Sequence, residues 1–212
     1  MTTSRTHART RLLALASGLA GASVAAYVVA TERVRADRVE RAETLPGDDL
    51  IPSPIGSLTN AITIRRPPRD VWPWLAQMGA GSRAGWYSYD SVDNGGRPSA
   101  SHIASELQQL MVGMVFPALP NATDGFVLLS YEPEGSLVLG WRSPNGATLV
   151  TWAFILRAME DGGTRLIVRA RGGAGYQFHS MPWWLAKHIV PFGHFVMQRK
   201  QLLGIARRAE LV

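Results

Sequence analysis

The stretch from Phe126 to Arg171 decides the fold, and it reads FVLLSYEPEGSLVLGWRSPNGATLVTWAFILRAMEDGGTRLIVRAR. Runs rich in β-branched and aromatic residues, at 126–131, 136–142, 147–157 and 164–171, are separated by short turns that contain glycine. Such turns are typical of β-hairpins, and Asn145-Gly146 between apolar runs is the strongest of these signals. The stretch therefore predicts an antiparallel meander of four strands.

The residues before the meander predict a first strand and two short helices. Residues 58–65 alternate in polarity around a β-branched centre, which is typical of a half-buried strand. Behind Asp70, a good N-cap residue, apolar side chains recur at helical spacing from Val71 to Met78. A second short helix is expected near 103–110, and an extended segment near 112–116.

A long helix is expected after the meander, because apolar residues recur on one helical face near the C-terminus. They are Phe192, Phe195, Val196, Leu202, Leu203 and Ala206. Pro191 is expected to kink or interrupt this helix. A long amphipathic helix can bury its apolar face on a sheet, so we expect an α+β domain in which a curved antiparallel sheet packs on this helix.

The N-terminal segment is expected to be a membrane anchor. Residues 12–30 read LLALASGLAGASVAAYVVA without a charge, close to the length of about 20 residues that spans a bilayer core. A cleaved signal peptide and a soluble packing helix remain alternatives. The expected organisation is a basic tail (1–11), an anchor (12–30), a polar stalk (31–48) and a ligand-binding domain (49–212). Arginines on both sides of the segment leave its orientation open.

Composition excludes several classes of function. The 212 residues contain no cysteine, which excludes disulfides and thiolate metal sites. The five histidines form no zinc motif, and we expect neither a metal nor a cofactor. The net charge of +6 is concentrated at the two ends, and no groove-reading motif accompanies it, so we expect no nucleic-acid partner.

The order of elements resembles the helix-grip fold of the START-like superfamily, also called the SRPBCC or Bet v 1-like group. The resemblance is carried by Ala61 to Gly79, Gly85 to Asn94, Thr151 to Arg157, Thr164 to Arg171 and Val196 to Glu210. It is closest to a bacterial subgroup with an N-terminal apolar segment, and it covers residues 48–210. The resemblance implies a cavity between sheet and helix. Members bind lipids, sterols, polyketides or plant hormones there, and some are polyketide cyclases or dehydratases.

Several side chains are candidates for lining that cavity. The expected ligand-binding residues are Tyr87, Tyr89, Trp141, Trp152, Phe154, Phe195 and Arg199. Trp152 and Phe154 share one face of a strand, because side chains alternate, and core packing alone would give them the same composition. Arg199 on the helix would either reach the pocket or extend its charge into solvent.

A catalytic role has only weak candidates, namely Tyr89, Asp90 and Arg169. Tyr89 and Asp90 lie in an aromatic loop and could act in proton transfer, or they could simply pack that loop. Arg169 shares a strand face with Arg165 and Arg171, and this face either clamps an anionic head group or is solvated.

The sequence thus favours a membrane-tethered binding protein for a hydrophobic small molecule or lipid over an enzyme. One alternative is a cyclase or dehydratase that uses Tyr, Asp and Arg side chains in the cavity. The other is a structural or interaction protein whose cavity is filled by its own side chains. Ligand identity, protein partners and oligomeric state stay open.

Overall fold

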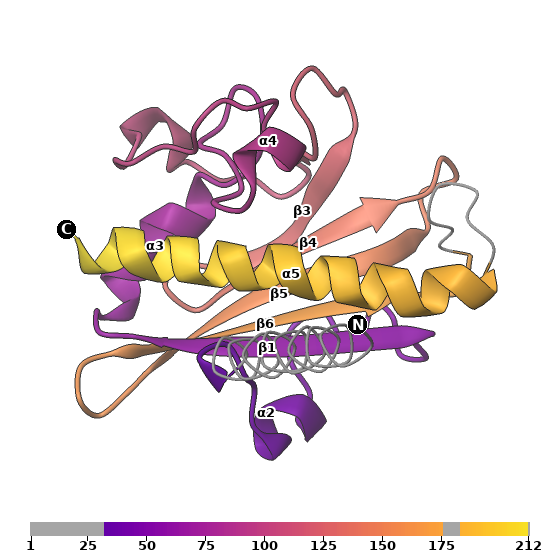
Figure 1. Cartoon of the computed structure of the whole chain (residues 1–212), viewed down its shortest axis with the longest axis horizontal. Helices are drawn as coiled ribbons and strands as arrows, with labels where there is room; N and C mark the ends of the chain where they lie inside the picture. Colours follow the sequence, from indigo (N-terminus) through magenta and orange to yellow (C-terminus); the bar gives the residue numbers. More distant parts are fainter. Residues whose placement is uncertain (1–31, 176–182, 212) are drawn as a thin grey trace, which may run out of the picture. The chain divides into compact units, whose positions relative to one another are not determined.

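The computed structural model describes residues 32–175 and 183–211, without the side chains of 183–190. Arg35 to Val212 forms one compact unit. Within this unit, a single antiparallel sheet and a long helix dominate (Figure 1).

Six strands form the sheet in the order β1-β6-β5-β4-β3-β2. Their bounds are Gly56–Ile64 (β1), Val115–Pro117 (β2), Gly125–Glu132 (β3), Ser136–Arg142 (β4), Thr148–Ala158 (β5) and Thr164–Gly172 (β6). All pairs are antiparallel. The four-stranded meander β3 to β6 is confirmed. β1 pairs with β6 at one end of the meander, and β2 pairs with β3 at the other.

The helix α5 spans Trp183–Glu210 and crosses one side of the sheet (Figure 1). It continues through Pro191, so the expected interruption is wrong. Pro191 lacks the N–H of an ordinary helical residue, yet the helix extends across it from Trp183 to Glu210. The expected helix-grip arrangement of sheet and C-terminal helix is therefore present.

The shorter helices differ in detail from the expectation. The helix α3 spans Pro68–Ala76 with Pro67 as its N-cap, so Asp70 lies in its first turn instead of capping it. The second expected helix is reduced to a 3-10 turn, Ser105–Leu107, and an additional short helix, α4, spans Asp90–Asp93. Both short segments lie in the long connection between α3 and β2.

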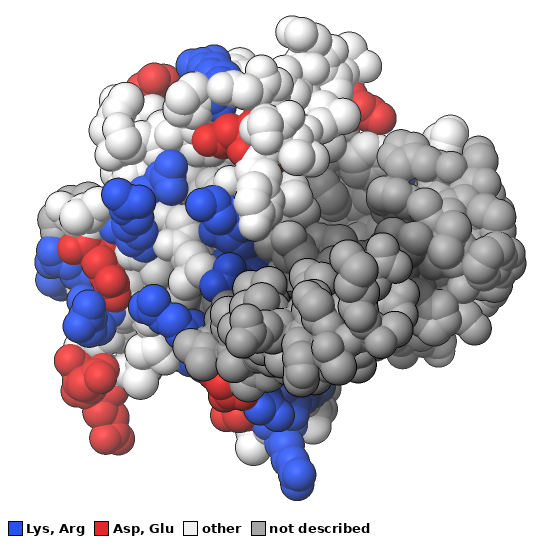
Figure 2. Space-filling model, in the orientation of Figure 1, with Lys and Arg blue, Asp and Glu red and all other residues white. Residues whose placement is uncertain are grey.

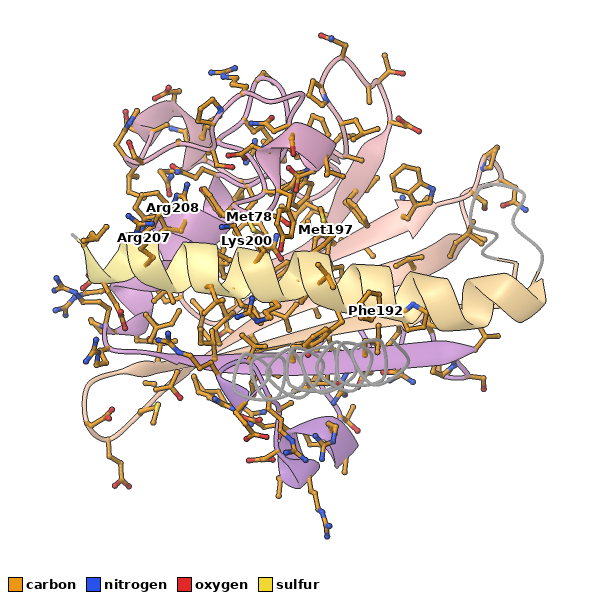
Figure 3. All side chains as sticks on the ribbon, viewed as in Figure 1. Met78, Phe192, Met197, Lys200, Arg207 and Arg208 are labelled. Atoms are coloured by element: carbon orange, nitrogen blue, oxygen red, sulfur yellow. The ribbon has the colours of Figure 1, made fainter. Side chains whose placement is uncertain are left out.

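The face of the sheet toward α5, here called the inner face, carries the larger side chains. Register places Leu137, Trp152 and Phe154 on this face, beside Val168 of β6. Among the described side chains of α5, the buried ones are Gln198, Gln201, Leu202, Ile205, Ala206 and Ala209. The buried side of the helix is therefore mixed polar and apolar, and it includes Leu202 and Ala206 of the apolar stripe that the sequence suggested. Phe192, labelled in Figure 3, is 59% exposed.

The opposite, outer face of the sheet is covered by the chain that precedes β1. This segment contains the helix α2, Arg38–Ala42. Its apolar residues Ala36 and Leu45 join a buried cluster with Ala61, Val138 and Ile167 of the sheet. Residues 35–48, which were expected to form part of a polar stalk, are thus packed on the sheet.

No helix within 32–175 and 183–211 is long and apolar enough to cross a membrane. The expected anchor, residues 12–30, lies outside the described part of the chain.

Candidate ligand-binding site

Five aromatic side chains form one connected cluster on the inner face. They are Trp86, Phe126, Trp141, Trp152 and Phe154, which we call the aromatic cluster. Trp152 lies at its centre, with ring centroids 5.3 Å from Trp86 and 5.1 Å from both Phe126 and Phe154. The cluster therefore joins strands β3, β4 and β5 to the loop after α3.

The cluster is only partly buried, although it lies on the face that α5 covers. Trp86 and Phe154 are inaccessible or nearly so, whereas Phe126, Trp141 and Trp152 keep intermediate exposure. A side chain of intermediate exposure keeps part of its surface in contact with solvent, so the space beside these three rings is not completely filled. The inner face thus presents aromatic surface that the chain's own described side chains do not fully cover.

A row of polar side chains on α5 faces this aromatic surface. The indole Nε1 of Trp152 donates to Oε1 of Gln198 at 2.9 Å. Nε2 of Gln198 donates to Oε1 of Gln201 at 2.8 Å, and Nε2 of Gln201 lies 3.7 Å from Sδ of Met78 (labelled in Figure 3). The ring of His194 meets Trp152 edge-on at 6.0 Å. The site therefore combines an aromatic floor with a few polar groups, which is the usual form of a small-molecule site.

The loop after α3 is held against one side of α5. Oγ of Ser88 donates to the backbone oxygen of Met197 at 3.1 Å (Figure 3), and the guanidinium of Arg208 lies 4.7 Å from the centroid of the Tyr87 ring. The backbone oxygen of Tyr87 comes so close to Gly204 that a side chain there would collide with it. These contacts fix the position of Trp86 beside Trp152.

The predicted ligand-binding residues fall into three environments. Trp141, Trp152 and Phe154 belong to the aromatic cluster on the inner face. Tyr87 is buried behind the loop, and burial raises the pKa of its hydroxyl against smaller lowering effects of Gln77, Arg208 and Arg83. Tyr89 is 39% exposed beside Lys200. Phe195 and Arg199 are half-buried on α5.

The three catalytic candidates are not brought together. Asp90 accepts hydrogen bonds from N and Oγ of Ser99 and so ties its own loop, while Tyr89 lies toward solvent. Arg169 projects from the outer face of the sheet. There its Nη1 contacts Oδ2 of Asp48 at 2.5 Å and also donates to the backbone oxygen of Glu43, while Nε donates to Thr59 and Nη2 to the backbone oxygens of Glu40 and Arg41.

The outer-face arginines therefore act as structural anchors for the preceding segment. Arg171 also binds Asp48, at 2.8 Å, and Arg165 binds Glu40 at 2.6 Å. This face is neither the solvated surface nor the head-group clamp that the sequence left open. Sequence reasoning placed the three arginines on one face correctly but had no signal for the acidic residues, which lie more than 120 positions earlier in the chain.

A buried carboxylate that the sequence did not suggest lies in α4. Asp93 is 8% exposed, and its Oδ1 has no hydrogen-bond partner within the described residues. Burial, with a smaller effect of the Asp90 charge, raises the pKa of Asp93 to about 6. No cluster of three potential metal ligands occurs among the described residues.

The polar row was also missed from the sequence. His194, Gln198 and Gln201 recur at the spacing of one helical face. This spacing is present in the sequence, but an apolar stripe through Phe192 and Phe195 predicted a different inward side for the helix. Glutamines are rarely buried, so the apolar stripe was the more natural choice for the inward side.

Positive charge gathers on the solvent side of α5, away from the aromatic cluster. Figure 2 shows Lys and Arg side chains grouped on one part of this face, with acidic side chains among them. Lys200 and Arg207 of α5 are exposed. Nearby acidic groups include Glu210, which pairs with Arg65 at 3.6 Å.

Comparison with known proteins gave structural matches only. No family model matches the chain. No curated protein matches it significantly. A Polyketide_cyc-like protein from Corynebacterium glutamicum is 14% identical, with 76% of this chain and 94% of that one covered and a TM-score of 0.37. The Aha1 dimer from Colwellia psychrerythraea is also 14% identical, with 72% and 99% covered and a TM-score of 0.36. CalU16 from Micromonospora echinospora is again 14% identical, with 73% and 84% covered and a TM-score of 0.34.

The helix-grip assignment itself rests on the strand order and on α5. The six-stranded antiparallel sheet and α5 agree with the helix-grip fold that the sequence predicted.

Proposed function

We propose that this protein binds a hydrophobic small molecule on the inner face of the sheet, beneath α5. The observation that carries the proposal is the intermediate exposure of Phe126, Trp141 and Trp152 on a face that a helix covers. Partly exposed aromatic surface of this kind is expected to take up an apolar partner, because removing the remaining apolar surface from water is favourable. A polyketide cyclase-like activity gains no support from the site, since Tyr89 and Asp90 do not meet Arg169.

The proposal is tested by introducing a large side chain on the inner face of the sheet, in the space that a ligand would occupy. Ala170 of β6 lies opposite Trp152 of β5 in the sheet and is half-buried. In Ala170→Phe, the new ring would occupy the space that a ligand needs. We expect native mass spectrometry of the full-length protein, purified gently from its source, to show one bound species in the wild type and none in Ala170→Phe.

Ala147→Phe is the matched control, because Ala147 is exposed in the turn between β4 and β5. It adds the same ring and should keep the bound species. If the inner face is instead filled by the protein's own side chains, Ala170→Phe should lower the free energy of unfolding by about 1–3 kcal/mol through overpacking. That destabilisation, together with an empty wild type after incubation with a lipid extract, would contradict the proposal.

We also propose that residues 12–30 tether this binding domain to a membrane, where apolar ligands partition. The support is the uncharged apolar run between two groups of arginines. The full chain is expected to stay in the membrane fraction after alkaline carbonate washing, with its intact mass unchanged. A mature protein that lacks the first residues and is released by the wash would indicate a cleaved signal peptide.

A further inference from the structure

The polar row on α5 ends in a nitrogen of His194 for which the described residues supply no hydrogen bond. His194, Gln198 and Gln201 lie on the side of α5 that faces the aromatic cluster. The two glutamine side chains are engaged through Trp152 Nε1, each other and Met78. His194 as a residue has intermediate exposure, but Nε2 of its ring is shielded from solvent and has no hydrogen-bond partner among the described residues.

An unpaired buried nitrogen is costly, because it loses its hydrogen bonds to water and gains none in exchange. Burial also lowers the pKa of His194 to about 4, against a smaller opposing effect of Gln198. The imidazole is therefore neutral at neutral pH. A neutral ring beside Trp152 offers a ligand one hydrogen bond and no charge.

We infer that the ligand is an uncharged apolar molecule whose single polar group, a hydroxyl or its equivalent, hydrogen-bonds to Nε2 of His194. This inference rests on the proposed function, because it assigns the ligand class of the same inner face. The apolar body would lie against the aromatic cluster, and the polar group would complete the row that runs through Gln198 and Gln201.

The distribution of positive charge argues against an anionic ligand. The arginines of β6 project from the outer face, where Arg165 binds Glu40 and both Arg169 and Arg171 bind Asp48. A carboxylate brought to the inner face would lose its hydration without a cation from these strands, which is strongly unfavourable. An anionic ligand would need a cation such as Arg199, which is half-buried on α5. The experiment below therefore includes a substitution of Arg199.

Three probes with the same aromatic body separate the possibilities, namely pyrene, 1-pyrenemethanol and 1-pyrenecarboxylate. Binding to the full-length protein is measured by energy transfer from tryptophan, in one detergent solution for all variants. We expect the wild type to bind 1-pyrenemethanol roughly tenfold more tightly than pyrene, the typical gain from one hydrogen bond. We expect 1-pyrenecarboxylate to bind no better than pyrene.

His194→Phe keeps a planar ring beside Trp152 and removes both nitrogens. It should abolish the preference for 1-pyrenemethanol and leave the affinity for pyrene unchanged, whereas Arg199→Gln should change neither. Equal affinities of the wild type for pyrene and 1-pyrenemethanol would overturn the inference while the proposed function stands. A preference for the carboxylate that disappears in Arg199→Gln would also overturn it.

If none of the three probes binds, the proposed function itself is contradicted. If the probes bind without a preference for 1-pyrenemethanol, only the inference about the ligand class is contradicted. If His194→Phe does not fold, the order of the three wild-type affinities still decides the inference.

Discussion

Replacement of Asp48 by asparagine is expected to lower the free energy of unfolding by about 3–5 kcal/mol, because it leaves a buried cation without its countercharge. Oδ2 of Asp48 contacts Nη1 of Arg169 at 2.5 Å, and Oδ1 contacts Nη1 of Arg171 at 2.8 Å. Arg169 is only 3% exposed and Asp48 7%. The measurement is urea unfolding of the full-length protein at neutral pH, with the wild type beside Asp48→Asn.

Asp49→Asn is the matched control, because it removes the same charge from the next residue, which is exposed. Its effect should stay within about 0.5 kcal/mol, as is usual for surface substitutions. If Asp48→Asn and Asp49→Asn unfold at the same urea concentration, the ion pair on the outer face contributes little to the stability of the folded chain.

The effect of Asp48 should also depend on pH in a defined direction. Burial alone would raise the pKa of Asp48, but hydrogen bonds from Arg171, the Leu45 backbone and Arg169 hold it below its ordinary value of 3.8. A carboxyl group whose folded pKa is depressed stabilises the protein above the unfolded pKa and loses this contribution as pH falls toward the folded one. The difference between wild type and Asp48→Asn should therefore be constant near neutrality and shrink below about pH 4.

The meander was predictable because its signals are local. Asn145-Gly146 and Asp161-Gly162 place turns between runs of strand-forming residues, and each strand pairs with its neighbour in sequence. The same locality placed Trp152 and Phe154 on one face of β5. Alternation of side chains is enough to group them, and the structure joins them to one aromatic cluster.

What the sequence could not supply was the identity of contacts between distant segments. The environment of Arg169 depends on Asp48, 121 residues earlier, and no local pattern connects the two. The inward side of α5 was predicted correctly at Leu202 and Ala206 but wrongly at Phe192, for a related reason. Gln198 is buried, and its side-chain oxygen accepts a hydrogen bond from Trp152, 46 residues away. The fold thus satisfies the polar amide group, whereas the sequence of the helix alone gives no sign of this partner.

The second large effect is expected at Gly204, where α5 passes the loop that positions Trp86. A Cβ at this position would lie 2.3 Å from the backbone oxygen of Tyr87 and 3.1 Å from its Cβ. Because a backbone oxygen cannot rotate away, Gly204→Ala must shift either the helix or the loop. We expect it to lower the free energy of unfolding by about 1–3 kcal/mol, the usual range for overpacking, although alanine favours a helix.

Gly193 provides the control on the same helix, because no atom lies within 4 Å of the Cβ that it would gain. Gly193→Ala should therefore show only the difference in helix propensity and raise the free energy of unfolding by up to about 1 kcal/mol. The two substitutions are chemically identical, so opposite signs in urea unfolding isolate the contact with Tyr87. Stabilisation by both would mean that α5 does not rest on this loop. Tryptophan fluorescence of Gly204→Ala should also change, since the displaced loop carries Trp86, which stacks on Trp152 at 5.3 Å.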